Sequence, residues 1–429
     1  MGFRRKSSAR TLRWVALALA LIVIGITINY VASKKTIDQL IETDYAVADP
    51  AFRNSLGNLI GPQFLPGNAA VTLLNGDQIF PAMLEGIRSA TNSVTLETYI
   101  WESGKVGSQF MTALMERARA GVIVSVIVDG MGTLKLKTAE IDQMKSAGIR
   151  FVKFGRAHWY KIKLSMNHRT HRKLLVIDGR VGFTGGVCLA DKWTGCADQE
   201  DHWRDTQFRV EGPAVRQMQG VFADNWLLTT GEVLQGARYF PEIDPKGRAQ
   251  VQCFKSGPKQ GEESARLVHL LAIAAARKSI RLSHAYFVPD DLAVKTLVAA
   301  CRRGVKVQVI VPARNDSKIG RAASRSRWGA LVDAGVEIFE YQPSLFHCKE
   351  MIVDDVFVSA GSVNFDNRSF RINDEANINV LDRDFAARQV EVFESDKAHS
   401  SLLTAAELHR KPWYTKAADR AAGLLRSIL

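Results

Sequence analysis

Cysteine is scarce in this 429-residue chain, and its scarcity excludes two kinds of structure. Its five cysteines are too few and too widely scattered for a disulfide framework or for a zinc cluster of the usual spacing. One bond stays open: Cys188 and Cys196 lie eight positions apart and could pair in one loop if this part of the chain is outside the cytoplasm. The five cysteines are Cys188, Cys196, Cys253, Cys301 and Cys348.

Acidic residues are also in deficit, with 44 Asp and Glu against 57 Lys and Arg. The resulting formal charge of +13 favours a polyanionic partner, either nucleic acid or anionic lipid head groups. The remaining composition, 46% hydrophobic and 24% charged, is that of an ordinary globular protein with room for more than one domain.

An almost wholly apolar run at residues 14–32 is just long enough to span a bilayer as a helix. The basic tail at residues 1–13 precedes it, and two lysines follow it. This surplus of basic residues predicts a cytoplasmic N-terminus, a retained single-pass anchor and a body outside the cytoplasm. A cleaved signal peptide is the alternative interpretation. Residues 33–69 are expected to form a linker.

The body contains one long repeat used twice. Four segments recur in the same order on either side of a linker at residues 229–250, which is rich in glycine and proline. Alternating strands and helices predict an α/β fold with two pseudo-symmetric α/β/α domains, at 70–228 and 251–400, each with a mainly parallel, buried sheet. A helical segment at 401–429 is expected to lie at a membrane interface or to pack on the body. The paired segments are 93–99 with 279–286, 120–128 with 303–311, 146–151 with 333–338, and 171–191 with 347–366.

The most informative pattern is His, any residue, Lys, four residues, Asp, and it occurs in both copies of the repeat. In a strand, side chains alternate between faces, so the histidine and lysine of each copy point the same way. The aspartates complete the candidate catalytic set, and we interpret them as structural acceptors near the site rather than as attacking groups. We interpret Cys348, between a histidine and a lysine, as a packing residue. The six motif residues are His171, Lys173, Asp178, His347, Lys349 and Asp354.

Two histidines and two lysines can cleave and remake a phosphodiester without a metal ion. One neutral imidazole attacks phosphorus and forms a phosphohistidine, while the other, protonated, donates to the leaving alkoxide. The lysines neutralise the non-bridging oxygens in the transition state. A histidine in this role needs an orienting carboxylate. From spacing, we expect Asp205 to serve His171 and Glu375 to serve His347.

A glycine turn follows each motif, and small residues there let backbone N–H groups approach a phosphate. We therefore expect Gly185 and Gly186 in the first copy, and Gly361 and Ser362 in the second, to bind substrate. Asn364 can donate an amide hydrogen bond to a phosphoryl oxygen. Its counterpart Cys188 is a poor donor, so the two copies are not expected to be equal.

These motifs resemble the signature of the phospholipase D superfamily, His-x-Lys-x4-Asp-x6-Gly-Ser-x-Asn in duplicate. The second copy matches fully, whereas Gly186 and Cys188 depart from it in the first. Flanking segments are similar to bacterial cardiolipin synthases over about residues 70–400. They are 97–101, 203–206, 210–213, 286–290 and 367–369.

The resemblance implies a cofactor-free ping-pong reaction in which His171 takes up a phosphatidyl group and His347 acts as acid and then base. The product would be cardiolipin, made from phosphatidylglycerol and a second phospholipid at the bacterial inner membrane, and the partners would be anionic phospholipids and the membrane. Hydrolysis to phosphatidic acid is the alternative function. An endonuclease or a non-catalytic lipid-binding protein is less consistent with the anchor and with two intact motifs, so no nucleic-acid partner is expected. A basic run at residues 314–327 could collect anionic head groups.

Overall fold

The computed structural model describes residues 14, 37–155, 168–258, 263–316 and 318–409. The predicted tail at 1–13, the predicted membrane helix at 14–32 apart from Trp14, and most of the predicted C-terminal helix lie outside this set. Within the described residues, no helix has both the length and the apolar character needed to cross a membrane. The chain divides into two compact units, Met1–Gln39 and Leu40–Leu429, and everything below concerns the second.

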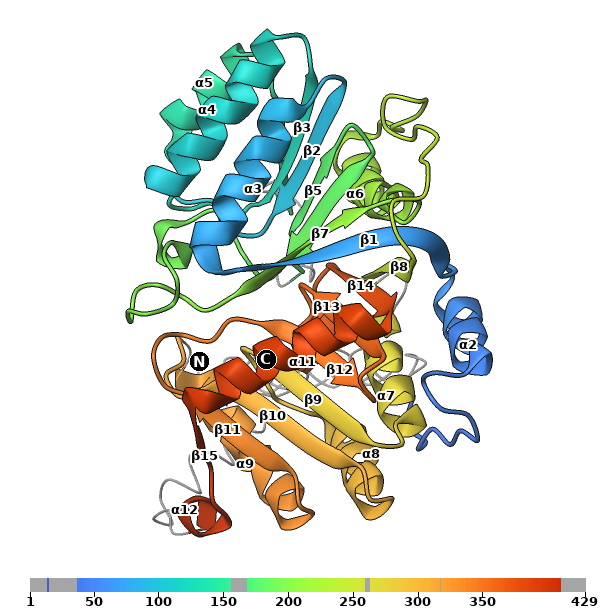
Figure 1. Ribbon diagram of the computed structural model, residues 1–429. Helices are drawn as coiled ribbons and strands as arrows, with labels where there is room; N and C mark the ends of the chain where they lie inside the picture. Colours follow the sequence, from blue (N-terminus) through green and yellow to red (C-terminus); the bar gives the residue numbers. More distant parts are fainter. Residues whose placement is uncertain (1–13, 15–36, 156–167, 259–262, 317, 410–429) are drawn as a thin grey trace, which may run out of the picture. The chain divides into compact units, whose positions relative to one another are not determined.

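The first half of this unit, residues 40–230, contains strands and helices, as predicted (Figure 1). Its last helix ends at Gly231, whose positive φ of 78° lets its N–H bond back to Leu227. The elements are α2 (Pro50–Ile60), β1 (Leu65–Leu74), α3 (Asn75–Ser89), β2 (Ser93–Thr98), α4 (Lys105–Arg119), β3 (Ile123–Asp129), α5 (Thr138–Ser146), β4 (Arg150–Phe154), β5 (Leu174–Ile177), β6 (Val181–Gly185), η2 (Asp191–Trp193), β7 (Thr206–Glu211) and α6 (Val215–Thr230).

The second half, residues 249–409, repeats the order of the first. Three of its helices begin at side-chain caps, because Asp290, Asp366 and Asp382 each accept a hydrogen bond from the backbone N–H three residues on. The elements are β8 (Ala249–Ser256), α7 (Ser264–Ala275), β9 (Ser279–His284), α8 (Asp291–Arg302), β10 (Lys306–Pro312), α9 (Lys318–Asp333), β11 (Glu337–Tyr341), β12 (Lys349–Val353), β13 (Phe357–Gly361), α10 (Asn367–Arg371), β14 (Glu375–Leu381), α11 (Arg383–Ala398), β15 (Ser400–Leu402) and α12 (Ala405–His409).

A fifteen-stranded sheet joins the two halves, and its strand order reads the same way from both ends. The order is β15-β11-β10-β9-β12-β13-β14-β8-β1-β7-β6-β5-β2-β3-β4. Apart from the extra edge strand β15, each strand of the first half has a counterpart at the mirrored position. The halves meet where β1 pairs antiparallel with β8. They therefore form one compact unit rather than two separate ones.

The expectation of a mainly parallel sheet is wrong. Only the β2-β3-β4 and β9-β10-β11 groups pair in parallel, and the other described pairings are antiparallel. The reason is the short connections after the motif strands: β5 turns into β6, and β12 into β13, within three residues, which only an antiparallel pair allows. The predicted domain start at residue 70 also falls inside β1, which begins at Leu65.

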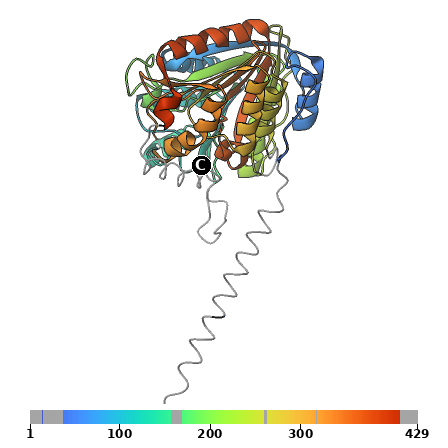
Figure 2. The same cartoon turned by 90° about the horizontal axis from the view of Figure 1, so that it is seen from below.

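Helices cover the sheet on both faces, which explains why its inner strands are buried throughout. Every residue of β2, β5 and β12 is buried. Figure 2 shows α11 on one side of the strands and α7 and α8 on the other. In the first half, Phe110 and Leu114 of α4 belong to the same buried apolar cluster as Val94 and Leu96 of β2. This packing fixes the strand ends from which the motif residues project.

Candidate active site

Two short backbone bridges between the halves place the motif histidines. Thr170 pairs in parallel with Asp374, and Phe346 pairs in parallel with Arg204. The histidine that follows each bridge is held by its own amide: the N–H of His171 donates to Asp374 O at 2.8 Å, and that of His347 to Arg204 O at 2.7 Å. Each histidine segment is therefore anchored on the other half of the chain, immediately before β5 or β12 begins.

The carboxylate partners of the histidines are crossed relative to the sequence-based expectation. His171 Nδ1 lies 2.9 and 3.0 Å from the two carboxylate oxygens of Glu375, and His347 Nδ1 lies 2.7 Å from Asp205 Oδ2. Asp205 and Glu375 are orienting groups, as expected, but each serves the histidine of the opposite half. The bridges are the physical cause, because each carboxylate follows directly on the segment that pairs with the other half's histidine.

The two carboxylates are themselves held differently. The Ser362 hydroxyl donates to Glu375 Oε2 at 2.5 Å, whereas the Trp193 indole N–H donates to Asp205 Oδ2 at 3.0 Å. At the position equivalent to Ser362 stands Gly186, where an added Cβ would lie 2.2 Å from Asp205 Oδ1. Because glycine stands here in place of serine, the first half has space for the Asp205 carboxylate.

Each motif lysine supports the backbone of the histidine two residues before it. Lys173 Nζ donates to His171 O at 2.7 Å, and Lys349 Nζ donates to His347 O at 2.6 Å. Lys349 Nζ also lies 3.1 and 3.3 Å from the two ring nitrogens of His347. Burial lowers the pKa of Lys349 to about 8, with Lys173 adding to the effect.

Both imidazoles have pKa values well below that of a free histidine, so both are neutral at pH 7. Burial is the largest influence and lowers the pKa of His171 and of His347 to about 4, against the partly compensating Glu375 and Asp205 carboxylates. Lys173 and Lys349 lower these pKa values further. With Nδ1 hydrogen-bonded to a carboxylate, each ring carries its proton there, and Nε2 keeps a lone pair.

Asp178 and Asp354 are structural, and they do not lie near the site. Each sits in a turn at the far end of its strand with a positive φ, 51° and 53°. Asp178 accepts from the backbone N–H groups of Asn92 and Ser93, and Asp354 from those of Lys278 and Ser279. Five residues of extended chain from the lysines put them roughly 16 Å away. The structure places both aspartates as hydrogen-bond acceptors in these turns and does not bring them together with the histidines and lysines.

The glycine turns do not form the expected phosphate cradle. The N–H of Gly186 donates to Thr206 O, and that of Ser362 to Ala376 O, because these residues continue the sheet ladder. An added Cβ at Gly185 or Gly361 would meet the backbone of the neighbouring strand, so these glycines serve close strand packing. Of the predicted substrate-binding residues, Asn364 alone lines the cavity, and Cys188 lines it at the equivalent place.

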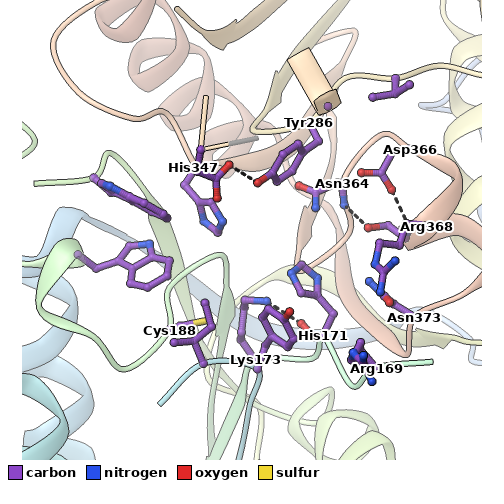
Figure 3. Close-up of a pocket in the computed structure, with 18 of the residues that line it drawn as sticks. Arg169, His171, Lys173, Cys188, Tyr286, His347, Asn364, Asp366, Arg368 and Asn373 are labelled. Carbon is purple, nitrogen blue, oxygen red and sulfur yellow. Dashed lines mark hydrogen bonds between the residues drawn. The ribbon is translucent and has the colours of Figure 1, made fainter. Parts of the chain in front are cut away.

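A cavity of about 360 Å³ opens between the two histidines (Figure 3). His171, Lys173, His347 and Asn364 line it, while Lys349 lies buried behind His347. Sequence reasoning missed most of the other lining side chains, although several stand in the flanking segments quoted for the resemblance. The lining residues that were not predicted as site residues include Tyr99, Arg169, Lys192, Trp193, Trp203, Tyr286, Asp316, Asp366, Arg368 and Asn373.

A buried polar network beneath His171 was also missed. The Thr170 hydroxyl donates to Glu97 at 2.5 Å, and the Asn225 amide donates to the same oxygen at 2.7 Å. Burial raises the pKa of Glu97 to about 7, against the nearby Arg172. Thr170 precedes the nucleophile candidate directly, so this network holds the His171 segment in place.

The structure also shows the surroundings of the cysteines and of the basic run that the sequence analysis singled out. Cys188 is buried and Cys196 exposed, and both are free thiols, so the bond left open between them is not formed. Cys348 is buried against Arg204 O and the Thr206 hydroxyl, as its interpretation as a packing residue required.

In the basic run at 314–327, four arginines form ion pairs with the body: Arg314 with Glu200, Arg321 and Arg325 with Glu340, and Arg327 with Asp291. Among the described residues, no group of three or more His, Cys, Asp or Glu has a geometry that could hold a metal ion.

Both halves of the chain are similar to known proteins. The family model "Cardiolipin synthase, PLD-like domain" matches residues 83–226 and 270–397, one match in each half. A cardiolipin synthase of Geobacillus kaustophilus is 34% identical over 86% of this chain and 74% of its own length. Cardiolipin synthase 2 of Bacillus anthracis is 32% identical over 83% of this chain and 70% of its own.

The fold is shared with more distant structures. The crystal structure of the phosphatidylserine synthase of Haemophilus influenzae superimposes with a TM-score of 0.63 at 15% identity, covering 88% of this chain and all of that one. Two paired motifs, two crossed histidine–carboxylate pairs and the family match over both halves lead to one conclusion. The chain belongs to the cardiolipin synthase family of phospholipase D-like proteins.

Proposed function

We propose that the protein is a phosphatidyltransferase that makes cardiolipin from phosphatidylglycerol and a second phospholipid. The observation that carries the proposal is the pair of histidines facing one cavity, each oriented by a buried carboxylate from the opposite half. The relatives named cardiolipin synthase, at about 33% identity over most of the chain, support the same reaction class.

In the proposed reaction, Nε2 of His171 attacks the phosphorus of the donor lipid. His171 keeps its proton on Nδ1, hydrogen-bonded to Glu375, and the negative charge of this carboxylate stabilises the imidazolium as the P–N bond forms. His347, protonated in the substrate complex, donates its proton to the departing glycerol oxygen, and Lys173 and Lys349 neutralise the phosphoryl oxygens. The acceptor hydroxyl then attacks phosphorus, gives its proton to His347, and releases His171.

The low histidine pKa values explain why substrate must help to protonate the acid. Burial is the main cause of the low pKa of His347, and the two lysines lower this pKa further. A bound phosphodiester brings one negative charge beside those lysines, which raises the pKa of the neighbouring imidazole. Substrate binding is therefore expected to favour the protonated form of His347.

The anchor is part of the proposal. Residues 14–32 would hold the body at the bacterial inner membrane, with the body on the outer side, where its phospholipid substrates are at high local concentration. Transfer rather than hydrolysis requires that an acceptor alcohol reach the intermediate before water does. Hydrolysis to phosphatidic acid remains the competing outcome at the same site.

The test is to incubate vesicles of phosphatidylglycerol with the full-length protein and to identify the products by mass. Cardiolipin together with released glycerol is expected, and neither His171→Ala nor His347→Ala should form it. Phosphatidic acid alone would make the protein a hydrolase, and cleaved DNA with untouched lipid would overturn the proposal.

A further inference from the structure

Two tryptophan rings line the cavity beside His347. The rings of Trp193 and Trp203 lie 4.8 Å apart, and their centroids are 5.3 and 5.4 Å from that of the His347 ring. At the equivalent positions of the second half stand Ser369 and Asn373, so this pair of indoles has no counterpart there. The two sides of the cavity therefore offer a substrate different surfaces.

The two indoles and a carboxylate surround a cation. The ammonium group of Lys192 lies 4.8 Å from the ring centroid of Trp193 and 4.3 Å from that of Trp203, and it lies 3.9 Å from Glu102 Oε1. Aromatic faces around a positive charge are the arrangement by which proteins recognise ammonium and quaternary ammonium groups. We call Trp193, Trp203 and Glu102 the cation cage. Its occupant is one of the protein's own side chains.

The proposed reaction puts the departing head group beside this cage. His347 donates its proton to the head-group oxygen, so that oxygen lies within hydrogen-bond reach of the imidazole. In phosphatidylcholine and in phosphatidylethanolamine two carbon atoms separate this oxygen from the nitrogen, so the positive charge would reach the indoles. The acceptor alcohol gives its proton to the same imidazole and occupies the same place. The cage therefore faces both the group that leaves and the group that enters.

Lys192 makes this place unfavourable for a second cation. Its side chain lines the cavity, and because it is tethered to the chain, a head group cannot carry it away. An ammonium group that entered the cage would lie within a few ångströms of the Lys192 ammonium, where like charges repel strongly. Glycerol carries no charge and meets no such repulsion, and its hydroxyl oxygens can accept hydrogen bonds from the ammonium group.

We infer that Lys192 fills the cation cage and thereby excludes phospholipids with an ammonium head group from the leaving-group side of the cavity. The inference rests on the proposed function and deepens it, because it names the head groups that the enzyme accepts. For an accepted donor, the P–O bond to the head group breaks as the P–N bond to His171 forms, and the proton of His347 goes to the head-group oxygen. Preference for glycerol then comes from a repulsive group built into the site.

The test is a competition between two donors in one membrane. Full-length protein is incubated with vesicles that contain phosphatidylglycerol and phosphatidylcholine in equal amounts, and released glycerol and released choline are measured together. Each is released once for every phosphatidyl group that His171 takes up, whether that group then passes to an alcohol or to water. The measured quantity is the ratio of choline to glycerol.

Lys192→Met empties the cage but keeps the length of the side chain, and Lys135→Met is the matched control. Lys135 also contacts Glu102, at 3.3 Å, but its side chain is 74% exposed and is not among those that line the cavity. In the wild type, choline release should be at least about a hundredfold below glycerol release. Lys192→Met should raise the ratio about tenfold to a hundredfold, because contact with two indoles replaces a repulsion. Lys135→Met and Lys192→Arg should change it less than about threefold.

Adding Trp203→Leu to Lys192→Met should remove most of the gain, because the gain depends on the indole. An unchanged ratio in Lys192→Met would overturn the inference, and an equal fall in both products would assign Lys192 to the phosphoryl group instead. Lys192→Gln, which also removes the charge, serves if Lys192→Met does not fold. Wild-type protein that releases choline as readily as glycerol would overturn the inference but leave the transfer reaction intact. Wild-type protein that makes no cardiolipin from phosphatidylglycerol alone would overturn the proposed function, and the inference with it.

Discussion

The crossing of the histidine–carboxylate pairs leads to a prediction about which variants behave alike. Glu375→Gln keeps the size of a fully buried side chain but removes the charge 2.9 Å from His171 Nδ1. When His171 becomes cationic during attack, the lost interaction acts over about 4 Å, which at an effective dielectric constant near 20 is roughly 4 kcal/mol. Turnover should therefore fall about a hundredfold to a thousandfold.

The assay compares two leaving groups on the same phosphatidyl donor. Glycerol needs a proton to leave, whereas p-nitrophenol ionises near neutrality and leaves without one. With the natural lipid, all four variants His171→Asn, His347→Asn, Asp205→Asn and Glu375→Gln should be slow. With the p-nitrophenyl ester, the acid pair, His347→Asn and Asp205→Asn, should recover a burst of p-nitrophenol. The nucleophile pair, His171→Asn and Glu375→Gln, should not.

The grouping of the variants decides the result. If Glu375→Gln recovered together with His347→Asn, the carboxylates would serve the histidines of their own halves, and the crossed geometry would be refuted. If His171→Asn and Glu375→Gln recovered as a pair, the crossing would stand, but the nucleophile would be His347. Circular dichroism of each variant separates loss of chemistry from loss of fold.

Three further predictions concern stability and the support of the site. Gly186→Ala should lower the turnover rate about a hundredfold, because the added Cβ would displace the Asp205 carboxylate. The measurement is the turnover rate of a variant whose fold has been verified by circular dichroism. Arg204→Met should cost about 3–5 kcal/mol in urea unfolding, since it leaves buried Asp396 without the guanidinium that contacts it at 2.8 and 2.9 Å; a cost below 1 kcal/mol would contradict it. Burial lowers the pKa of His269 to about 4 in the folded protein, so the imidazole stays neutral down to about that pH. In the unfolded chain the same side chain takes up a proton below about pH 6.5. Stability should therefore fall between pH 6.5 and 4, and His269→Gln should reduce that fall by about 3 kcal/mol.

The sequence was most informative where one residue pattern has one structural meaning. The duplicated His-x-Lys motif predicted both histidines and both lysines of the site, and the long repeat predicted matching halves. Alternation of strands and helices could not reveal sheet direction, because a strand such as β6 reads alike whether it follows a helix or a tight turn. The antiparallel part of the sheet was therefore missed.

The pairing of carboxylates failed for a related reason. Spacings of 34 and 28 residues describe distance along the chain, and Asp205 and Glu375 fit a partner in their own half equally well. Which half they serve is decided by two backbone bridges that no local pattern records. Arg169 and Trp193 were missed because a single arginine or tryptophan in a loop carries no signal until the fold brings it to the cavity.

The crossed pairs also constrain how this chain can change in evolution. Consider a chimera that joins the first half of one such protein to the second half of another, at the connection between α6 and β8. It would contain both histidines and both carboxylates, but in each hydrogen-bonded pair the two members would come from different proteins. Its His171 would meet a carboxylate that had adapted to a different imidazole. The two halves are free to diverge in sequence, as Gly186 and Ser362 already have, only as long as each change suits the half across the cavity. Replacing one half alone would therefore change one member of each histidine–carboxylate pair and leave the other member unchanged.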